Sequence, residues 1–388
     1  MHFLYKDGYK FLMKAIIIRS NPILPDPRVE KECYALKNNG IDVEVLAWDR
    51  SANYYKKNES LVIKGIDIPV QRFGIKGIFG GGIKANFIPL LKFQFRFLKW
   101  LIYHRKEYNV IHACDFDTAL MSFFCARLIG KKFVYDIFDY YVEAFSIPKR
   151  LKGIIKALDD FIISKADSVI ICTEKRRKQI NYINSAKTTI IHNSPDLFMG
   201  EKVIKNFPKD NGKIRFVYVG ILQDGRFIKE LIDVIKYRND CELHIGGFGV
   251  LEEEIVEETY KYSNIKFYGK LSYNRTLELE NWCDIITAIY DPRVPNHYYA
   301  APNKFYEALM LGKPLIMVKN TGMDQIVAKY NIGQVINFDK DELMQAIDKL
   351  ILEKDNWKET AIRMKKIYYD NYSWIIMEKR LISLYTKL

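Results

Sequence analysis

Apolar residues follow two patterns that alternate along the chain: short aliphatic runs, and longer segments in which apolar positions return every three or four residues. The short runs are typical of buried strands, and the longer segments are typical of amphipathic helices. In the first half, strands are predicted at 15–20, 42–48, 109–114, 132–137, 168–173 and 188–193. Helices are predicted at 27–40 and 118–130. This alternation predicts a parallel sheet with crossover helices.

The alternation starts again in the second half. Helical segments at 227–238 and 252–262 separate predicted strands. These strands are 214–220, 241–247, 265–269, 286–290 and 314–318. We therefore expect an α/β chain built from two doubly wound, Rossmann-like domains.

A polar segment separates the two halves. Residues 194–213 contain Pro195 and Pro208 and lack an apolar period, which predicts a linker. The expected domains are 1–196 and 197–388. The final helix, about 366–388, is expected to pack back on the N-terminal domain.

Composition agrees with a globular chain and narrows its partners. The chain has 388 residues, of which 49% are hydrophobic and 28% charged, enough for two domains with cores of their own. Its formal net charge of +13 favours polyanionic partners such as nucleic acid, phosphorylated ligands or an anionic membrane.

Cysteine usage and hydropathy predict a cytoplasmic protein. The six cysteines are scattered without a CxxC pair, which argues against a zinc site and against a disulfide framework. Lys6, Asp7 and Lys10 interrupt the N-terminal segment, so it lacks the apolar core of a signal peptide. No run approaches the roughly 20 apolar residues that a spanning helix needs.

Residues 83–108 mix aromatic and basic side chains. The basic residues are Lys84, Lys92, Arg96, Lys99, Arg105 and Lys106. A basic amphipathic helix of this kind can lie in the interface of an anionic membrane. The alternative is a helix that packs its aromatic residues in the core. RNA binding has no support from an RNP, KH or helix-turn-helix pattern, so no nucleic acid is expected.

Glycine-rich loops follow two predicted strands of the second half. Gly220 ends one strand and is followed by Gly225, Arg226 and Lys229, and "HIGGFG" places Gly247 and Gly249 after the next. Such loops let backbone N–H groups approach a phosphate, although ordinary turns use glycine as well. Neither loop is GxGxxG or a Walker A sequence, which argues against a dinucleotide dehydrogenase and a P-loop ATPase.

The stretch "APNKFYEALMLGKPLI" predicts a helix that starts near Asn303 and ends at Gly312. Free N–H groups at its start, with Lys304 beside them, would hold a pyrophosphate. Glu307, about one turn further on, could accept hydrogen bonds from both hydroxyls of a ribose. The alternative is an exposed Lys–Glu pair without function.

This stretch resembles the donor-binding motif of the glycosyltransferase family 4 (group 1) enzymes, in which "PNK" is followed by a glutamate and a "GKP" turn. The resemblance extends over most of the chain: "PDPRVEKECYALKNNGIDVEVL" is similar to the family's first turn and helix, and "VIHACDFDTAL" to its "DxxHAHD" stretch. "TTIIHNSPD" resembles the turn that leads into the hinge. The resemblance implies the GT-B fold, two facing Rossmann-like domains with a cleft between them.

The resemblance also implies roles for individual residues. The leaving diphosphate would be neutralised by Arg226, Lys304 and Lys229, and Glu307 would bind the ribose. The other donor-binding positions are Gly220, Gly247, Gly249 and Asn303. His112 and Asp115 would line the cleft and contact sugar or acceptor, as catalytic candidates together with Arg226 and Lys304. For His112, the alternative is a buried structural histidine. The candidate acceptor-side residues are Asp26, Arg28, Asp136 and Asp139.

Three positions depart from the family pattern. Tyr299 stands where the family often has a second glutamate that contacts the sugar, and Cys114 replaces a histidine of "HAHD". Asp26 and Arg28 occupy the loop that usually carries a Gly-Gly turn. The "DFD" of residues 115–117 could be a metal-binding DxD, but that motif belongs to the other large glycosyltransferase fold. We expect neither a metal nor a cofactor.

The resemblance thus predicts a retaining glycosyltransferase that moves a sugar from a nucleotide-sugar, expected to be a UDP-sugar, to a glycan or lipid-linked acceptor. Its expected role is cell-surface polysaccharide or glycoconjugate assembly, with the N-terminal domain on the acceptor side and the C-terminal domain binding the nucleotide-sugar. Peripheral binding to the inner face of the cell membrane is expected through about 83–108. The alternatives are a nucleotide-sugar 2-epimerase of the same fold and a non-catalytic nucleotide- or RNA-binding protein.

Overall fold

The chain folds into two compact units. The computed structural model describes residues 13–23, 25–52, 56–78, 82–144, 147–180, 184–196 and 211–388. The first unit runs to Ile191 and also includes Glu378–Leu388, and the second is His192–Met377. The boundary thus falls a few residues before the expected one. Most of the expected linker, 197–210, lies outside the described residues.

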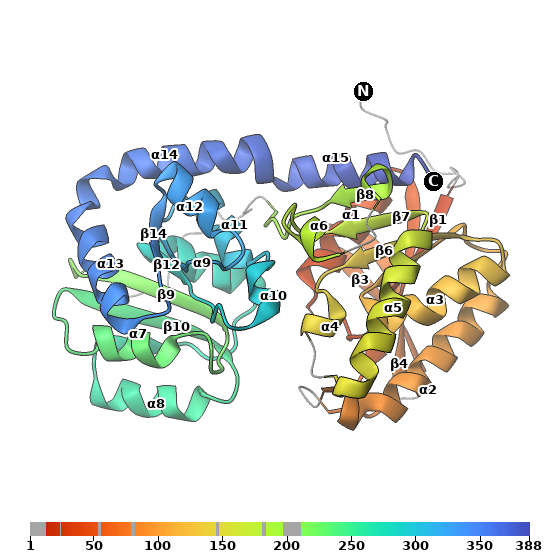
Figure 1. The fold of residues 1–388 in the computed structure, drawn as a ribbon, viewed down its shortest axis with the longest axis horizontal. Coiled ribbons are helices and arrows are strands. Elements are labelled where there is room, and N and C mark those ends of the chain that lie inside the picture. Colours follow the sequence, from red (N-terminus) through yellow and green to blue (C-terminus); the bar gives the residue numbers. More distant parts are fainter. Residues whose placement is uncertain are drawn as a thin grey trace. The chain divides into compact units, whose positions relative to one another are not determined.

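The first unit is built on an eight-stranded sheet with the order β3-β4-β2-β1-β5-β6-β7-β8 (Figure 1). Its strands are β1 Met13–Arg19, β2 Ile41–Asp49, β3 Lys56–Ile63, β4 Ile66–Gly74, β5 Val110–Cys114, β6 Lys132–Ile137, β7 Ser168–Ile171 and β8 Thr188–Ile190. All neighbours pair in parallel except β3 and β4. The sequence analysis did not predict this hairpin. Its turn uses Lys64 and Gly65, both at positive φ, as a tight two-residue connection requires.

Helices cover both faces of this sheet. They are α1 Pro27–Asn38, α2 Gly82–Tyr103, α3 Phe116–Leu128, α4 Tyr141–Ala144, α5 Lys149–Lys165 and α6 Arg176–Gln179, with a short 3-10 turn at Ser185–Lys187. Asp26 caps α1 by accepting a hydrogen bond from the Val29 N–H, and Pro27 occupies the first helical position. The helices α2, α3 and α5 lie side by side (Figure 1). Trp48, Phe93 and Phe97 are central to the core beneath them.

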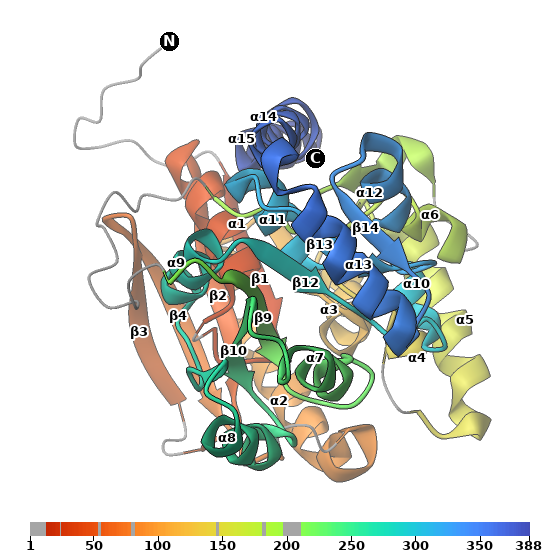
Figure 2. The ribbon, with the colours of Figure 1, turned by 90° about the vertical axis from the view of Figure 1, so that its left-hand side faces the viewer.

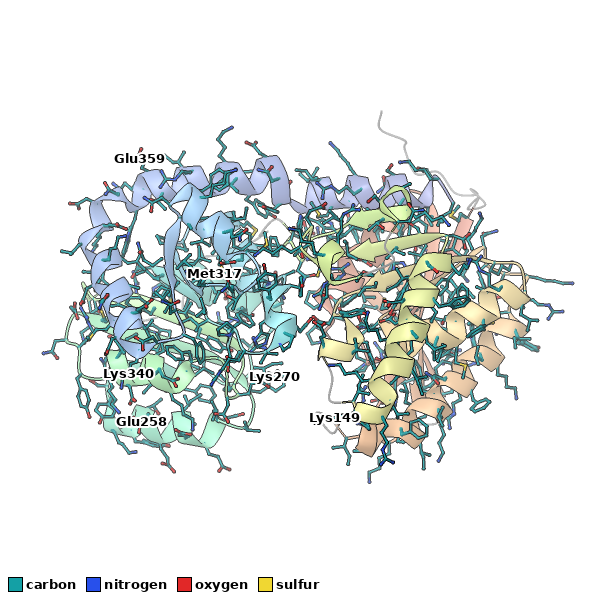
Figure 3. The ribbon with its side chains drawn as sticks, in the orientation of Figure 1. Lys149, Glu258, Lys270, Met317, Lys340 and Glu359 are labelled. Atoms are coloured by element: carbon teal, nitrogen blue, oxygen red, sulfur yellow. The ribbon has the colours of Figure 1, made fainter. Side chains whose placement is uncertain are left out.

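The second unit is a six-stranded parallel sheet with the order β11-β10-β9-β12-β13-β14. The strands are β9 Ile214–Ile221, β10 Cys241–Phe248, β11 Ile265–Phe267, β12 Ile285–Ala288, β13 Leu315–Val318 and β14 Gly333–Ile336. Figure 3 labels Met317, which is fully buried in β13. The reversal of strand order between β9 and β12 is the kind of position where doubly wound sheets bind ligands.

The helices of this unit again pack on both faces. They are α7 Ile228–Ile235, α8 Glu252–Lys261, α9 Tyr273–Trp282, α10 Pro295–Tyr298, α11 Asn303–Leu311, α12 Asp324–Tyr330, α13 Lys340–Leu352 and α14 Trp357–Ile367. The last helix, α15 Trp374–Tyr385, begins in this unit, but from Glu378 onwards it belongs to the first unit. A 3-10 turn at Lys354–Asn356 and a π-turn at Tyr368–Tyr372 lie between the last three. Figure 2 shows α7 and α13 as neighbours, and α11 packs against both α9 and α14. Among the described helices none is long and apolar enough to cross a membrane.

Candidate functional site

Three glycines, Gly220, Gly247 and Gly249, lie at or just after the carboxyl ends of β9 and β10, and we call this part of the sheet the glycine edge. Gly247 of β10 pairs with Gly220 of β9, and a Cβ on Gly247 would lie 1.8 Å from the Gly220 carbonyl oxygen. A Cβ on Gly249 would lie 2.2 Å from the Leu222 oxygen. Only glycine fits at these two positions. The sequence pattern therefore marks a place where two backbones approach closely and leave their edge open to a ligand.

Lys304 reaches this edge from the start of α11. A Cβ on Gly220 would lie 2.9 Å from the Lys304 Nζ, so the ammonium occupies the space that a side chain at Gly220 would fill. Its Nζ lies 4.7 Å from the centre of the Tyr218 ring. Lys304 is only 7% exposed, and within the described chain no carboxylate forms a salt bridge with it. Lys304 is thus a buried cation without a direct counterion.

The surroundings of Lys304 keep it charged. Burial by itself would lower the pKa of Lys304. The electrostatic influence of Tyr290 and Tyr218, followed by that of Glu307 and Glu280, outweighs burial and raises this pKa above its ordinary value. An ammonium that stays protonated here is suited to bind an anion.

Arg226 is a second cation, close to Tyr290, which is one of the two tyrosines that raise the pKa of Lys304. Its guanidinium carbon lies 4.2 Å from the centre of the Tyr290 ring. The Nη1 atom is buried and has no hydrogen-bond acceptor in the described part of the chain. A buried donor without an acceptor costs free energy, which a phosphate oxygen would recover. The next residue, Phe227, has φ 60°, a strained conformation of the kind that clusters at binding sites.

Glu307 is buried on α11 beside a second carboxyl that the sequence analysis missed. Glu280 of α9 is fully buried, and the Glu307 carboxyl lies within hydrogen-bonding reach of it. Burial, reinforced by the negative charge of Glu307, raises the pKa of Glu280 well above its usual range. Burial, together with the nearby charge of Glu307, raises the pKa of Tyr273, so its hydroxyl lies close to the same pair of carboxyls. A signal existed: Tyr273, Leu277 and Glu280 share one helical face, and a glutamate on a face that is otherwise apolar is unusual.

The other donor-side candidates are less closely grouped. Asn303 is exposed at the first position of α11. Lys229 forms a salt bridge of 2.6 Å with Glu254, and both side chains are about half exposed, so its charge is already paired. The Tyr299 ring packs edge-on against Tyr298 just after α10.

In the first unit, Asp115 is fixed at the carboxyl end of β5. One of its oxygens accepts hydrogen bonds from the Phe138 N–H at 3.0 Å and the Asp139 N–H at 3.3 Å, and the other pairs with Arg19. Arg19 also pairs with Asp26. Burial raises the pKa of Asp115 to about 6, against the lowering effect of Arg19. Its φ of 66° and ψ of 164° lie in a region that normally only glycine occupies.

Arg28 and Asp136 form a buried salt bridge. The Arg28 Nη2 lies 2.6 Å from the Asp136 Oδ1, and its Nε lies 3.2 Å from Glu32. Both arginines, Arg19 and Arg28, lie over the Phe138 ring. The candidates Arg28 and Asp136 are thus brought together, but their charges neutralise each other. Asp26 is likewise paired, with Arg19. Arg19 and Glu32 were not identified from the sequence, because each derives its importance from a contact with a distant segment.

Two further candidates lie in the first unit. For His112, the structure agrees with the alternative of a buried structural histidine, because its side chain has no exposed surface. Its Nδ1 lies 2.8 Å from the Tyr385 hydroxyl, and its Nε2 lies 3.7 Å from Asp136, so the described contacts of His112 are structural. Asp139 pairs with Arg176 at 3.4 Å, and its side chain is half exposed.

Ligand atoms of His112, Cys114 and Asp136 lie within 4.8 Å of one another, the one cluster in the described chain with metal-ligand spacing. The Arg28 guanidinium makes two hydrogen bonds to the Asp136 carboxylate, so a cation there would meet a positive charge. Of the "DFD" residues, Asp115 already pairs with Arg19. Neither set therefore fits a metal ion well.

Part of the chain matches a known protein family. Residues 200–369, which contain the glycine edge and α11, match the family described as "Glycosyl transferases group 1". No curated protein sequence matches the chain.

Solved structures match nearly its whole length. Sucrose-phosphate synthase from Thermosynechococcus elongatus has a TM-score of 0.72 at 16% identity, covering 97% of this chain and 98% of that one. HepE from Anabaena, in complex with UDP and glucose, has a TM-score of 0.70 at 14% identity, covering 97% and 100%. The catalytic domain of starch synthase IV from Arabidopsis thaliana, bound to ADP and acarbose, has a TM-score of 0.68 at 12% identity, covering 97% and 99%. These likenesses show the GT-B fold of two Rossmann-like domains.

Proposed function

We propose that this chain, a GT-B protein whose residues 200–369 form a glycosyl transferases group 1 domain, transfers a sugar from a nucleotide donor to a glycan or lipid-linked acceptor. The donor is proposed to be a UDP-sugar, because the similar HepE structure holds UDP and glucose. The observation that carries the proposal is a pair of cations, the buried Lys304 and the partly buried Arg226, for which the described part of the chain offers no carboxylate partner. The place of the reaction is proposed to be cell-surface polysaccharide or glycoconjugate assembly.

The proposed chemistry follows from these cations. An acceptor hydroxyl oxygen forms a bond to the anomeric carbon of the sugar while the bond from that carbon to the β-phosphate oxygen breaks. The bonding electron pair goes to the nucleoside diphosphate, and negative charge grows on its β-phosphate. Lys304 and Arg226 stabilise that charge, and a β-phosphate oxygen takes the acceptor proton on the same face, which gives retention. No metal or cofactor is needed for these steps.

Glu307 is proposed to hold the ribose. Its carboxylate lies one helical turn after Lys304 and can accept hydrogen bonds from two vicinal hydroxyls. Asn303 and the backbone N–H groups of Gly220 and Gly249 are proposed to contact the phosphates, whereas the Gly247 N–H already donates to the Gly269 carbonyl oxygen at 2.7 Å. In the first unit, Asp115 is the candidate for contact with sugar or acceptor, since its strained backbone is held in place by several hydrogen bonds. The partnered residues Asp26, Arg28 and Asp136 are proposed to support it.

A membrane surface is the proposed location of the acceptor. The inner face of α2 is core, where Phe93, Phe97 and Trp100 are buried. The outer face exposes apolar residues, among them Phe95 at 68%, next to exposed Lys92 and Lys99. The inner face of α2 thus fits the alternative of a helix that packs in the core, and its outer face fits the alternative of a membrane-binding helix. Arg96, expected among the membrane-facing cations, instead donates a hydrogen bond to the Gly74 carbonyl oxygen at 3.0 Å.

The same character continues on the neighbouring helices. The exposed apolar residues of α3 and α5 are Phe124, Leu128, Leu151, Ile154 and Phe161. The start of α5 adds Lys149, Arg150 and Lys152, all exposed (Lys149 is labelled in Figure 3). Apolar side chains that enter the interface, surrounded by cations for anionic headgroups, favour an anionic bilayer as the partner of this surface. We propose that it docks on the inner face of the cell membrane.

Nucleotide release tests the proposed reaction. The full chain is incubated with a panel of nucleotide-sugars, with and without lipid-linked acceptors, in buffers containing EDTA or magnesium. We expect one UDP-sugar to release UDP when an acceptor is present, at similar rates in both buffers. An epimerised donor in the absence of acceptor would identify an epimerase instead, and turnover that EDTA abolishes and magnesium restores would support the "DFD" metal site.

A further inference from the structure

The buried carboxyl of Glu280 has no evident reason to be charged. It lies on α9 without exposed surface, and neither oxygen receives a hydrogen bond from a donor in the described chain. The polar group within reach is the carboxyl of Glu307, on the neighbouring helix α11. A glutamate in such a place requires an explanation, because an unpaired buried carboxylate is very costly.

Two adjacent buried carboxyls are stable only if they share a proton. If both were ionised, they would repel each other at short range in a medium of low polarity. With one proton present, the protonated group donates an O–H···O⁻ hydrogen bond to the other, which is among the strongest that side chains form. A single proton therefore replaces the repulsion between the two carboxylates by a hydrogen bond that joins α9 to α11.

The surroundings decide which carboxyl holds the proton. Glu307 lies one turn from Lys304, whose positive charge favours the ionised form of Glu307, and the Tyr273 hydroxyl lies near Glu307. Glu280 has neither a donor nor exposed surface. The charged groups that act on Glu280 are Glu307 and Lys304, both from α11. The proton thus belongs on Glu280, whose pKa burial raises well above the usual range.

We propose that Glu280 is a protonated positioning residue that donates its O–H to Glu307 and thereby orients this carboxylate toward the ribose of a nucleotide ligand. An ionised carboxylate can accept about four hydrogen bonds. The Glu280 O–H would occupy one of these sites, and vicinal hydroxyls of a ribose would bind at others. The inference rests on the proposed nucleotide-sugar function and adds a residue that does not itself touch the ligand.

Two substitutions separate positioning from packing. In Glu280→Gln, the amide N–H₂ can still donate to Glu307, whereas Glu280→Leu keeps the volume and removes the donor. Glu278→Gln is the matched control, because Glu278 lies on the same helix but pairs with Arg275 at 2.6 Å. UDP affinity is measured by calorimetry between pH 6 and 9, and thermal unfolding checks that each variant is folded.

We expect Glu280→Gln and Glu278→Gln to bind UDP within about twofold of the unmodified chain at neutral pH. Glu280→Leu should weaken UDP binding about tenfold, the equivalent of one hydrogen bond to a charged group. At the pH where Glu280 ionises, the unmodified chain should lose affinity, and Glu280→Gln should not. Equal effects of Gln and Leu, or unchanged affinity in a folded Glu280→Leu variant, would overturn the proposal.

An infrared measurement separates this proposal from the proposed function. A carboxylic acid that stays protonated at pH 8 has a carbonyl stretching band that carboxylates lack. The band of Glu280 is measured as the difference between the unmodified chain and Glu280→Gln, because burial also raises the pKa of Glu32 well above its usual range. If the unmodified chain binds no uridine nucleotide yet shows the band, the function is wrong while the shared proton stands. If UDP binds and the band is missing, the function stands and the role of Glu280 is wrong.

Discussion

Lys304 and Glu307 are buried on the same helix, but they are expected to act at different stages of the reaction. Glu307 contacts a ribose whose structure does not change, so Glu307→Ala should weaken donor binding by roughly 1–3 kcal/mol, the cost of unsatisfied polar partners. Lys304 faces charge that grows in the transition state, so Lys304→Ala should lower kcat more than Glu307→Ala does. Steady-state kinetics on both variants test this difference.

Lys319→Ala is the matched control for these two substitutions, because Lys319 is exposed just after β13 in the same unit. It should leave kcat and KM unchanged. If Lys304→Ala and Glu307→Ala also changed neither constant, the pair would have no part in catalysis or donor binding, and the proposed site would be wrong.

Asp115 should make stability depend on pH in a defined direction. Its pKa is about 6 in the folded chain, against an ordinary value of about 4 when unfolded. The folded state therefore holds this proton more tightly, and the free energy of unfolding should fall as pH rises from about 4 to about 6. The contribution is about 3 kcal/mol for a shift of about two pKa units.

The measurement for Asp115 is urea unfolding of the unmodified chain and of Asp115→Asn between pH 4 and 7. The difference between their unfolding free energies should change from about pH 4 to about pH 6 and stay constant from there to pH 7. A difference that is the same at pH 4 and pH 7 would mean that Asp115 ionises normally and that the Arg19 contact compensates fully for burial.

Residues of the site could be predicted where their role depends on neighbours in the sequence. Gly247, Lys304 and Glu307 lie in short motifs that fix their local geometry, and the structure places all three in the second unit near one edge of the sheet. Glu280 could not be predicted in this way, because its meaning depends on a contact with another helix. The contact between His112 and Tyr385 joins positions from opposite ends of the chain.

The helix α2 carries the prediction about membrane binding. Reversing the charges of Lys92 and Lys99 together should weaken binding to anionic vesicles by at least about 2 kcal/mol, or about thirtyfold, because each cation contributes about 1 kcal/mol. Arg96 is left unchanged, since it joins α2 to the Gly74 carbonyl oxygen and its loss would disturb the fold. Co-sedimentation with vesicles, at low and high salt, measures the effect.

The control for the vesicle experiment reverses Lys349 and Lys358, which are exposed in the second unit and give the same change in net charge. This control should bind anionic vesicles almost as well as the unmodified chain. If both double variants lost binding equally, only net charge would matter. If neither lost binding, the exposed face of α2 would not be the docking surface.

Helices and strands were predictable to the extent that burial follows a simple period. The strands β5 and β6 are buried along almost their whole length, and β1 contains the buried aliphatic run Ile16–Ile18, as expected for strands covered on both faces. The hairpin of β3 and β4 was missed because β3 is an edge strand with mostly exposed side chains, so it has no buried run to identify it.

The chain as a whole confirms the predicted fold class, two Rossmann-like parallel sheets, and its likeness to solved GT-B structures covers 97% of its length. The division between the units was harder to predict. The first unit consists of the chain up to Ile191 together with the C-terminal residues Glu378–Leu388. Local composition marks a polar segment but does not show which body a helix packs on, since that depends on contacts far apart in sequence.

The central claim is that Lys304 and Arg226 make the second unit a binding site for a nucleoside diphosphate. Calorimetric titration of the full chain with UDP and with uridine tests it most directly, because the two ligands differ only in the diphosphate. Two charge-assisted contacts predict that UDP binds at least a hundredfold more tightly than uridine, and that Lys304→Ala removes much of this difference. Equal affinity for UDP and uridine, or a difference that Lys304→Ala leaves unchanged, would contradict the account.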